Sequence, residues 1–119
     1  MMLAILFFDG NLTDAKISKI IKVIDLLFKY GANLDIQDDG GRTALMKATN
    51  EKFRKYNFPI IDKLIELNAD WNIKDNKNED FIANLLVNGD ISKVKELQDK
   101  YPEKFEIYKL KKKSMKYNI

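Results

Sequence analysis

The sequence predicts an all-α fold built from stacked pairs of helices. Two segments of the chain, residues 30–38 and 67–75, align without a gap. Both carry small or turn-forming residues, an apolar residue, Asn or Asp, Ile and a final Asp in the same order. Each segment follows a run in which apolar residues recur at i, i+3 and i+4, the spacing of an amphipathic helix. An internal repeat of this kind predicts units that bury a shared core by stacking on their neighbours.

The first unit is expected to contribute two helices. The apolar start, residues 1–8, is shorter than the ~20 residues that a membrane-spanning helix needs. It also lacks the basic stretch and the cleavage site of a signal peptide, so we expect a short buried helix. After a loop over residues 9–16, the apolar positions between Ile17 and Phe28 predict a longer helix. Gly31 is placed to end that helix in a left-handed cap.

The middle unit repeats this arrangement. It begins within a turn-rich segment, residues 37–42, which we call the first turn. Thr43 follows it and is expected to cap a short helix through its hydroxyl. A long loop over residues 50–59 is expected next. The apolar residues after that loop predict a second helix, which Asn68 ends as Gly31 ends the earlier one.

The third unit begins within residues 74–79, which we call the second turn. Asn78 stands where the first turn has Gly41, and Asp80 stands where the middle unit has Thr43. We therefore interpret the unit as degenerate, with its turn signature lost. The expected organisation is a single domain, 1–119, with a partial repeat over 1–38, a middle repeat over 39–75, a degenerate repeat over 76–101, and a capping helix with a basic tail over 102–119.

Two stretches of the chain carry a family resemblance. Residues 41–48, Gly-Arg-Thr-Ala-Leu-Met-Lys-Ala, resemble the Gly-x-Thr-Pro-Leu-His-x-Ala pattern of the ankyrin repeat family. Residues 27–35 resemble its Leu-Leu-x-x-Gly-Ala-Asp/Asn-x-Asn/Asp pattern. Ala44 departs from the pattern by replacing proline, and Met46 by replacing the histidine that usually joins neighbouring loops through hydrogen bonds. The resemblance implies an ankyrin-type helical repeat solenoid with short β-hairpin-like finger turns and a C-terminal capping helix.

The resemblance also implies a binding surface, formed by the two turns and the exposed face of the short helices. The candidate partner-binding residues on it are Gln37, Asp39 and Arg42 of the first turn, Lys74, Asn76, Lys77 and Glu79 of the second turn, Lys47, Asn50 and Glu51 of the short helix, and Trp71. Each turn residue can instead serve only to solubilise the turn. Trp71 has an alternative role in packing, because its repeat equivalent is the apolar Leu34.

Composition narrows the function classes. The 119 residues contain no cysteine and no histidine, which excludes disulfides, thiolate metal sites, a cysteine nucleophile and the commonest general base. We expect no cofactor, no metal site and no enzymatic activity. The net charge of +3 is smaller than the positive excess that is typical of a dedicated nucleic-acid binder. The chain is expected to be cytoplasmic and monomeric.

These observations predict a protein–protein interaction module that holds a partner through the two turns and the concave face. A narrower version is an inhibitor or immunity-type partner of a bacterial protein. The alternative is binding of nucleic acid or anionic lipid through an aromatic-basic loop, residues 52–58, and a C-terminal lysine cluster. That cluster consists of Lys109, Lys111, Lys112, Lys113 and Lys116. In the plain structural interpretation, the loop packs its rings on the helices and the lysines suit the end of a helix.

Overall fold

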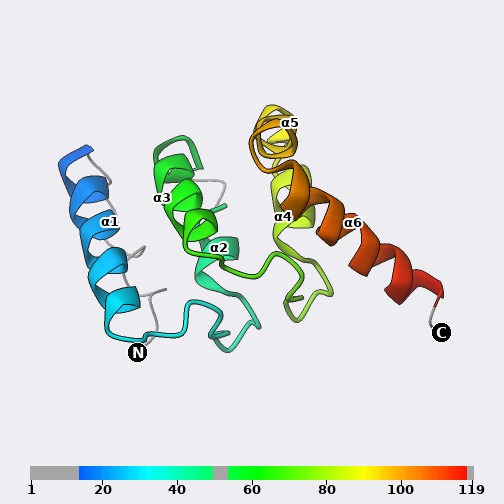
Figure 1. Ribbon diagram of the computed structural model, residues 1–119, viewed down its shortest axis with the longest axis horizontal. Helices are drawn as coiled ribbons and strands as arrows, with labels where there is room; N and C mark the ends of the chain where they lie inside the picture. The colour runs from blue at the N-terminus through cyan, green and yellow to red at the C-terminus, as the bar shows by residue number, and fades with distance from the viewer. Residues whose placement is uncertain (1–13, 50–53, 118–119) are drawn as a thin grey trace.

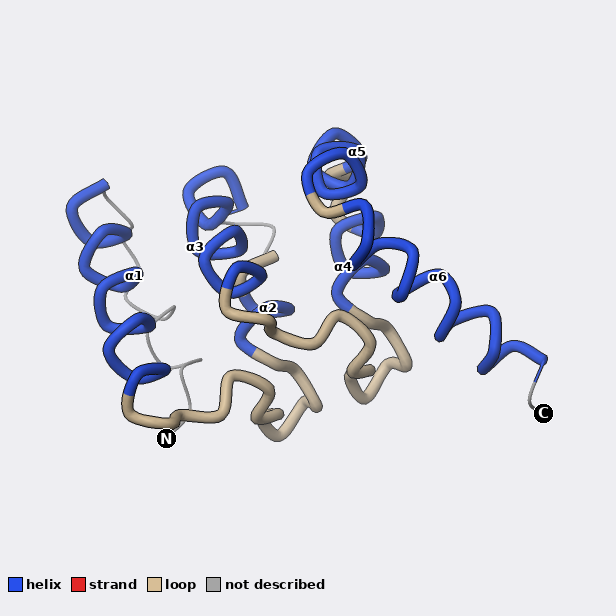
Figure 2. The backbone as a smooth tube through the Cα atoms, viewed as in Figure 1, coloured by secondary structure: helices blue, strands red, loops and turns tan. Residues whose placement is uncertain are grey.

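The computed structural model describes residues 14–49 and 54–117, and within these ranges it contains helices, turns and loops but no β-strand (Figure 1). The all-α fold class is therefore confirmed. The helices are α1 (Asp14–Lys29), α2 (Ala44–Lys47), α3 (Arg54–Glu66), α4 (Phe81–Val87), α5 (Ile91–Lys100) and α6 (Pro102–Tyr117). α1, α3 and the α4–α5 pair follow one another along the long axis, and the loops before α2 and α4 lie on the same side (Figure 2).

The helices are stacked so that each pair contacts the next. α1 packs on α3, and α2 packs on both α3 and α4. α4 packs on α5, and α5 packs on α6. The pairs α2–α3 and α4–α5 thus stand side by side, which is the arrangement that the aligned segments predict. In the described part of the chain, no helix combines the length and the apolar character that crossing a membrane requires.

One apolar cluster extends from α1 to α6 and joins these pairs. Its fully buried members include Ile24, Leu45, Ile60, Ile61, Leu64, Ile65, Phe81, Leu85 and Leu97. Each such side chain stabilises the fold by about 1.5–3 kcal/mol relative to an exposed position. Because the cluster is continuous, neighbouring helix pairs share their core.

The two long helices of the first and middle units end in left-handed residues, as the sequence predicts. Gly31 has a φ of 87° and Asn68 a φ of 70°. The next residue, Ala32 or Ala69, donates its main-chain N–H to the carbonyl five residues earlier at 3.0 Å. This bond belongs to the Schellman motif, which satisfies carbonyls at the end of a helix. Both caps are confirmed.

The short helices α2 and α4 begin in the same way. The Thr43 hydroxyl accepts a hydrogen bond from the N–H of Met46, and the Asp80 carboxylate accepts one from the N–H of Ala83 at 2.8 Å. Asp and Thr are both good N-cap residues, because each offers a side-chain oxygen to an N–H without an intrahelical partner. The cap predicted at Thr43 is confirmed. Asp80 performs the same function in the unit that was interpreted as degenerate.

The loop expected over residues 50–59 is wrong for most of its length, because α3 begins at Arg54. Pro59 lies inside this helix, not at its start. The sequence interpretation ended the loop at Pro59 because the apolar spacing that marks the helix begins only at Ile60. Phe58, within the added part of the helix, is half-buried against the core. Its apolar packing stabilises the helix before Pro59.

The expected terminal helix is confirmed as α6. Pro102 is its first residue, where the missing N–H has no cost. Phe105 and Tyr108 are buried, and they surround Trp71 together with Phe81 of α4. The ring centroids of these three residues lie 6.1, 6.4 and 5.8 Å from that of Trp71. An aromatic cluster thus holds α6 against the last helix pair.

Candidate partner-binding site

The first turn is held by one aspartate. The Asp38 carboxylate accepts hydrogen bonds from the N–H groups of Gly40 and Arg42 at 2.9 and 2.8 Å. Two main-chain bonds close the turn: the N–H of Asp38 donates to the carbonyl of Arg42, and the N–H of Gly41 donates to the carbonyl of Asp38. Gly41 has a φ of 76°, which an L-residue with a side chain rarely adopts.

The second turn has the same hydrogen bonds 37 residues later. The Asp75 carboxylate accepts from the N–H groups of Lys77 and Glu79, both at 2.9 Å. Asn78 takes the left-handed conformation of Gly41, with a φ of 65°. The turn predicted over residues 74–79 is therefore present, although its sequence signature is lost. Asparagine tolerates positive φ better than most residues. The turn geometry is therefore kept although asparagine replaces the glycine of the sequence pattern.

Both segments are hydrogen-bonded turns, and neither is flanked by a β-strand in the described residues. The hairpin-like part of the expected finger turns is therefore not observed. The main-chain bond from Asp75 N–H to the Glu79 carbonyl matches the bond that closes the first turn. A single aspartate and one left-handed residue are enough to define each turn.

The two turns are joined to each other. The main-chain N–H of Asn76 donates to the carbonyl of Gly40, and its side-chain Nδ2 donates to the carbonyl of Asp39, both at 2.9 Å. The Gln37 side chain donates across the gap to the carbonyl of Lys74 at 2.9 Å. These bonds supply the link between neighbouring loops for which the resembled family uses a histidine. Met46, at the position of that histidine, is buried at 1% exposure.

A groove of about 510 Å³ lies beside the second turn and α4. It is lined by Gly40, Arg42, Asp75, Asn76, Lys77, Glu79, Asn84, Val87 and Asn88. Its walls offer polar and apolar surface in similar amounts, and Val87, which is 72% exposed, presents an apolar side chain. Residues from both turns and from the short helix α4 thus meet around one hollow.

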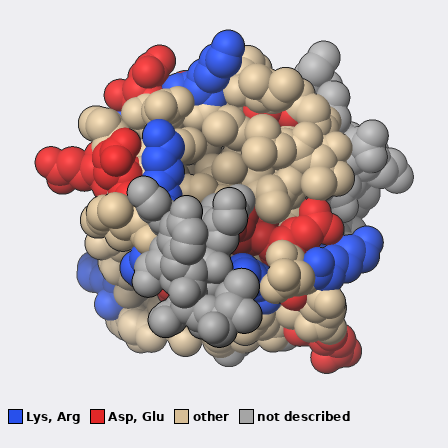
Figure 3. Space-filling view, turned by 90° about the vertical axis from the view of Figure 1, so that its right-hand side faces the viewer, with Lys and Arg blue, Asp and Glu red and all other residues tan. Residues whose placement is uncertain are grey.

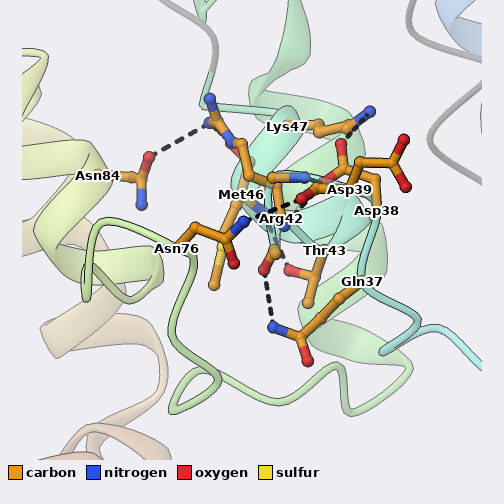
Figure 4. A network of polar contacts seen from close by, with 11 residues as sticks. Gln37, Asp38, Asp39, Arg42, Thr43, Met46, Lys47, Asn76 and Asn84 are labelled. Carbon is orange, nitrogen blue, oxygen red and sulfur yellow. Dashed lines mark hydrogen bonds and ion pairs between the residues drawn. The ribbon is translucent and has the colours of Figure 1, made fainter.

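Arg42 and Lys47 are both held by the fold. The Arg42 guanidinium donates to the carbonyl of Met46 at 2.9 Å and to the Asn84 side chain of α4 at 3.2 Å (Figure 4). The Lys47 ammonium lies 2.7 Å from the Asp38 carboxylate. This hydrogen bond lowers the pKa of Asp38 below its ordinary value, although partial burial opposes the shift. Lys47 thus stiffens the first turn, whereas the Arg42 side chain links that turn to α2 and α4 and forms part of the groove wall.

The other predicted residues fall into three groups. Gln37, Asp39, Lys74, Asn76 and Lys77 are exposed on the turns, and Glu79 is half-buried in the groove wall. Asn50 and Glu51 lie outside the described residues. Trp71 is 4% exposed, so the prediction that it contacts a partner is wrong and its packing alternative is confirmed. The reason is α6, whose Phe105 and Tyr108 cover the indole.

Sequence reasoning missed the α4 side of the groove. Asn84, Val87 and Asn88 stand 37 residues after Lys47, Asn50 and Glu51, the short-helix positions that were predicted. The same repeat spacing that identified the earlier positions therefore identifies the later ones. The Asn88 side chain also donates to the carbonyl of Thr49, which ties the end of α4 to the end of α2. The signal was lost because the third unit was interpreted as degenerate.

The aromatic-basic loop of the alternative function is also not observed. Residues 54–58 belong to α3, and the Phe58 ring lies 5.0 Å from the buried Lys93 ammonium. Residues 52 and 53 lie outside the described part of the chain. In the lysine cluster, the ammonium of Lys109 lies over the Phe105 ring and 3.7 Å from Glu106. Lys111 is exposed, while the side chains of Lys112, Lys113 and Lys116 are outside the described set.

Comparisons with known proteins give one partial match. The chain is 31% identical over 74 residues to the putative ankyrin repeat protein L86 of Acanthamoeba polyphaga mimivirus. The match covers 59% of this chain and 13% of that relative, so the chain spans a small part of the viral protein's length. No protein-family model matches the sequence. No solved structure matches it at a significant level.

Proposed function

We propose that this chain is a protein-interaction module of the ankyrin-repeat type, which binds a partner protein in the groove beside the two turns. The observation that carries the proposal is the hydrogen-bonded pair of turns with its adjoining groove. The similarity to a viral protein described as an ankyrin repeat protein supports it. The function is one of binding, without catalysis.

The groove is suited to a protein surface because its backbone is fixed before binding. Each turn is closed by its own aspartate, and bonds from Gln37 and Asn76 fix one turn to the other. A preformed site loses little conformational entropy when a partner arrives. Val87 offers an apolar contact, while Lys77 and Glu79 offer charges of both signs. A standard interface covers ~800 Å² on each partner, so the exposed turn tips complete the surface.

The proposal keeps one domain over residues 1–119, with repeats over 1–38, 39–75 and 76–101 and a capping helix after them. The second and third of these repeats supply the groove. A partner that is itself an enzyme or a toxin would make the module an inhibitor or immunity-type protein. That narrower function is tested by assaying the activity of the captured partner with and without the chain.

The test uses a groove variant, Lys77→Glu with Val87→Asp, and a matched control, Lys95→Glu with Leu26→Asp. The control makes the same changes at exposed positions on α5 and α1, far from the groove lining. Both variants and the wild-type chain are used as bait in cells that produce the chain, and captured proteins are quantified by mass spectrometry. We expect a partner that the wild type and the control enrich, and that the groove variant loses.

The captured partner is then titrated against the purified chains by calorimetry. We expect the groove variant to weaken binding by at least about tenfold, the equivalent of 1.4 kcal/mol. Equal affinity of the groove variant and the wild type would show that the partner binds elsewhere.

A further inference from the structure

A second hollow lies between α6 and the loop that follows α3. It measures about 300 Å³ and has no lining residue in common with the groove beside the turns. The residues that matter for its chemistry are Asp35, Asp70, Trp71, Lys104, Ile107 and Lys111. The face of the molecule on the α6 side carries acidic and basic side chains next to one another (Figure 3). We call this hollow the α6 pocket.

One wall of the α6 pocket is a single face of a helix. Lys104, Ile107 and Lys111 are spaced by three and four residues, which places them on the same side of α6. Ile107 is 51% exposed and gives this face an apolar centre. The Lys104 ammonium donates to the side-chain oxygen of Asn68 at the end of α3.

The other wall carries two carboxylates. Asp35 accepts a hydrogen bond from the main-chain N–H of Asp70 at 2.9 Å, so the two residues are neighbours. Asp70 in turn accepts from the main-chain N–H of Asn72 at 2.8 Å. Main-chain donors therefore fix both carboxylates.

The acidic and basic walls do not pair with each other. Among the described residues, none of Asp35, Asp70, Lys104 and Lys111 makes an ion pair. Two negative and two positive charges thus line one hollow without neutralising each other directly. Inorganic phosphate would meet the carboxylates, and a divalent cation would meet the ammonium groups. A ligand that carries both charges suits the pocket better than either ion.

Trp71 adds a further observation. Its indole N–H is buried and has no hydrogen-bond acceptor, although the residue lines the pocket. Buried donors nearly always have a partner in folded proteins. Because the N–H itself is covered, it serves as a reporter beside the pocket and not as a contact to a ligand.

We propose that the α6 pocket binds a free α-amino acid with an apolar side chain, in its zwitterionic form. The ligand carboxylate lies toward Lys104 and Lys111, and the ligand ammonium toward Asp35 and Asp70. The apolar side chain packs on the half-exposed Ile107. The hollow is at the lower end of the ~300–1,000 Å³ range of small-molecule sites, which suits a ligand of this size.

The experiment exploits the single tryptophan of the chain. Its indole N–H gives one cross-peak in a ¹H–¹⁵N correlation spectrum of the labelled full-length protein. The peak is followed during titration with L-leucine, with N-acetyl-L-leucine, which lacks the ammonium group, and with L-leucinamide, which lacks the carboxylate. We expect leucine to shift the peak saturably and each analogue to bind at least about tenfold more weakly, which is 1.4 kcal/mol.

Matched variants of α6 assign the effect to the pocket. Lys104→Gln with Lys111→Gln should raise the leucine Kd at least tenfold, whereas Lys109→Gln, on the same helix but outside the pocket lining, should leave it unchanged. Asp35→Asn, which keeps the acceptor for the Asp70 N–H, should weaken leucine but not N-acetyl-leucine. Equal binding of leucine and N-acetyl-leucine would overturn the zwitterion proposal. So would a peak that does not move at about 20 mM leucine, a concentration that detects even millimolar binding.

Discussion

Gly41 lies in close contact with the second turn. A Cβ atom built on it would lie 2.6 Å from the Asn76 side-chain oxygen and 2.9 Å from the Asn76 main-chain nitrogen. Gly31 has a similar positive φ, but a Cβ there would meet no atom within 4 Å. Substitution of Gly31 therefore tests only the strain of a left-handed backbone, whereas substitution of Gly41 adds the effect of a close contact.

Gly41→Ala should lower the free energy of unfolding by at least about 3 kcal/mol, because it combines both effects. Gly31→Ala should lower it by only about 1–2 kcal/mol, the cost of the backbone conformation alone. Urea unfolding followed by Trp71 fluorescence measures both values. Equal destabilisation by the two substitutions would mean that the turns do not hold each other as closely as described.

Asp38 makes the stability of the first turn depend on pH. The hydrogen bond from Lys47 lowers the pKa of this carboxyl, so the folded state binds a proton less readily than the unfolded state. Its stabilisation is therefore fully present above the unfolded pKa, about 3.9, and is lost as the pH falls through the folded value. Asp38→Asn keeps an oxygen for the N–H groups of Gly40 and Arg42 but has no charge.

We expect wild type and Asp38→Asn to differ in unfolding free energy by a constant amount between pH 5 and pH 7, and the difference to shrink below about pH 4. Denaturant titrations across this range measure it, and the other carboxyl groups cancel in the comparison. A difference that grows as the pH falls would contradict the assignment.

At the scale of the element, one hydroxyl fastens α6 to the start of α4. Tyr108 donates to the carboxylate of Asp80 at 3.0 Å, and that carboxylate also caps α4. Burial, together with the neighbouring Asp80 charge, raises the pKa of the Tyr108 hydroxyl. It therefore remains a donor in the folded protein beyond the pH at which an exposed tyrosine ionises.

Tyr108→Phe should destabilise the protein by about 1–3 kcal/mol, because Asp80 loses a buried donor. Tyr30→Phe is the control, since Tyr30 is 79% exposed. Because the folded pKa of Tyr108 is raised, its contribution is present below the unfolded value and declines as the pH rises above about 10. Hydrogen exchange in α6 measures the loss, and unchanged protection there would show that the aromatic cluster alone holds this helix.

How far the sequence predicted these elements depends on which residue types carry the signal. Apolar spacing located the long helices, and Gly31, Asn68 and Thr43 marked helix ends because few residues satisfy those positions. The second turn was predicted, but its close likeness to the first was not, because Asn78 and Asp80 take the roles of Gly41 and Thr43 with different residue types. The burial of Trp71 depends on α6, which is distant in sequence, and no local pattern encodes such a contact.

At the scale of the molecule, Lys93 joins two helix pairs. Its side chain is 1% exposed, and its ammonium lies 2.8 Å from Asp62 of α3 and 3.3 Å from Glu96. The Phe58 ring lies beneath it at 5.0 Å. A buried lysine is costly unless its charge is paired, so the contact between α3 and α5 depends on Asp62.

Asp62→Ala should therefore destabilise the protein more than Lys93→Met does. We expect about 2–4 kcal/mol for the first, which leaves a buried ammonium poorly paired, and less than about 2 kcal/mol for the second, which removes the charge but keeps the volume. Thermal unfolding of the two variants measures the difference. The reverse order would show that the lysine stem and its ring contact matter more than the ion pair.

Most of the donor and acceptor atoms in the hydrogen bonds between the two turns belong to the main chain. Asp39 and Lys74 contribute only their carbonyl groups to this joint, and the Lys77 side chain makes no contact with the described residues that would fix it. Positions 39, 74 and 77 are therefore open to nearly any side chain without loosening the scaffold. A library randomised at these three positions should remain folded and yield binders to new targets, and natural variation at them would change partners while leaving the architecture intact.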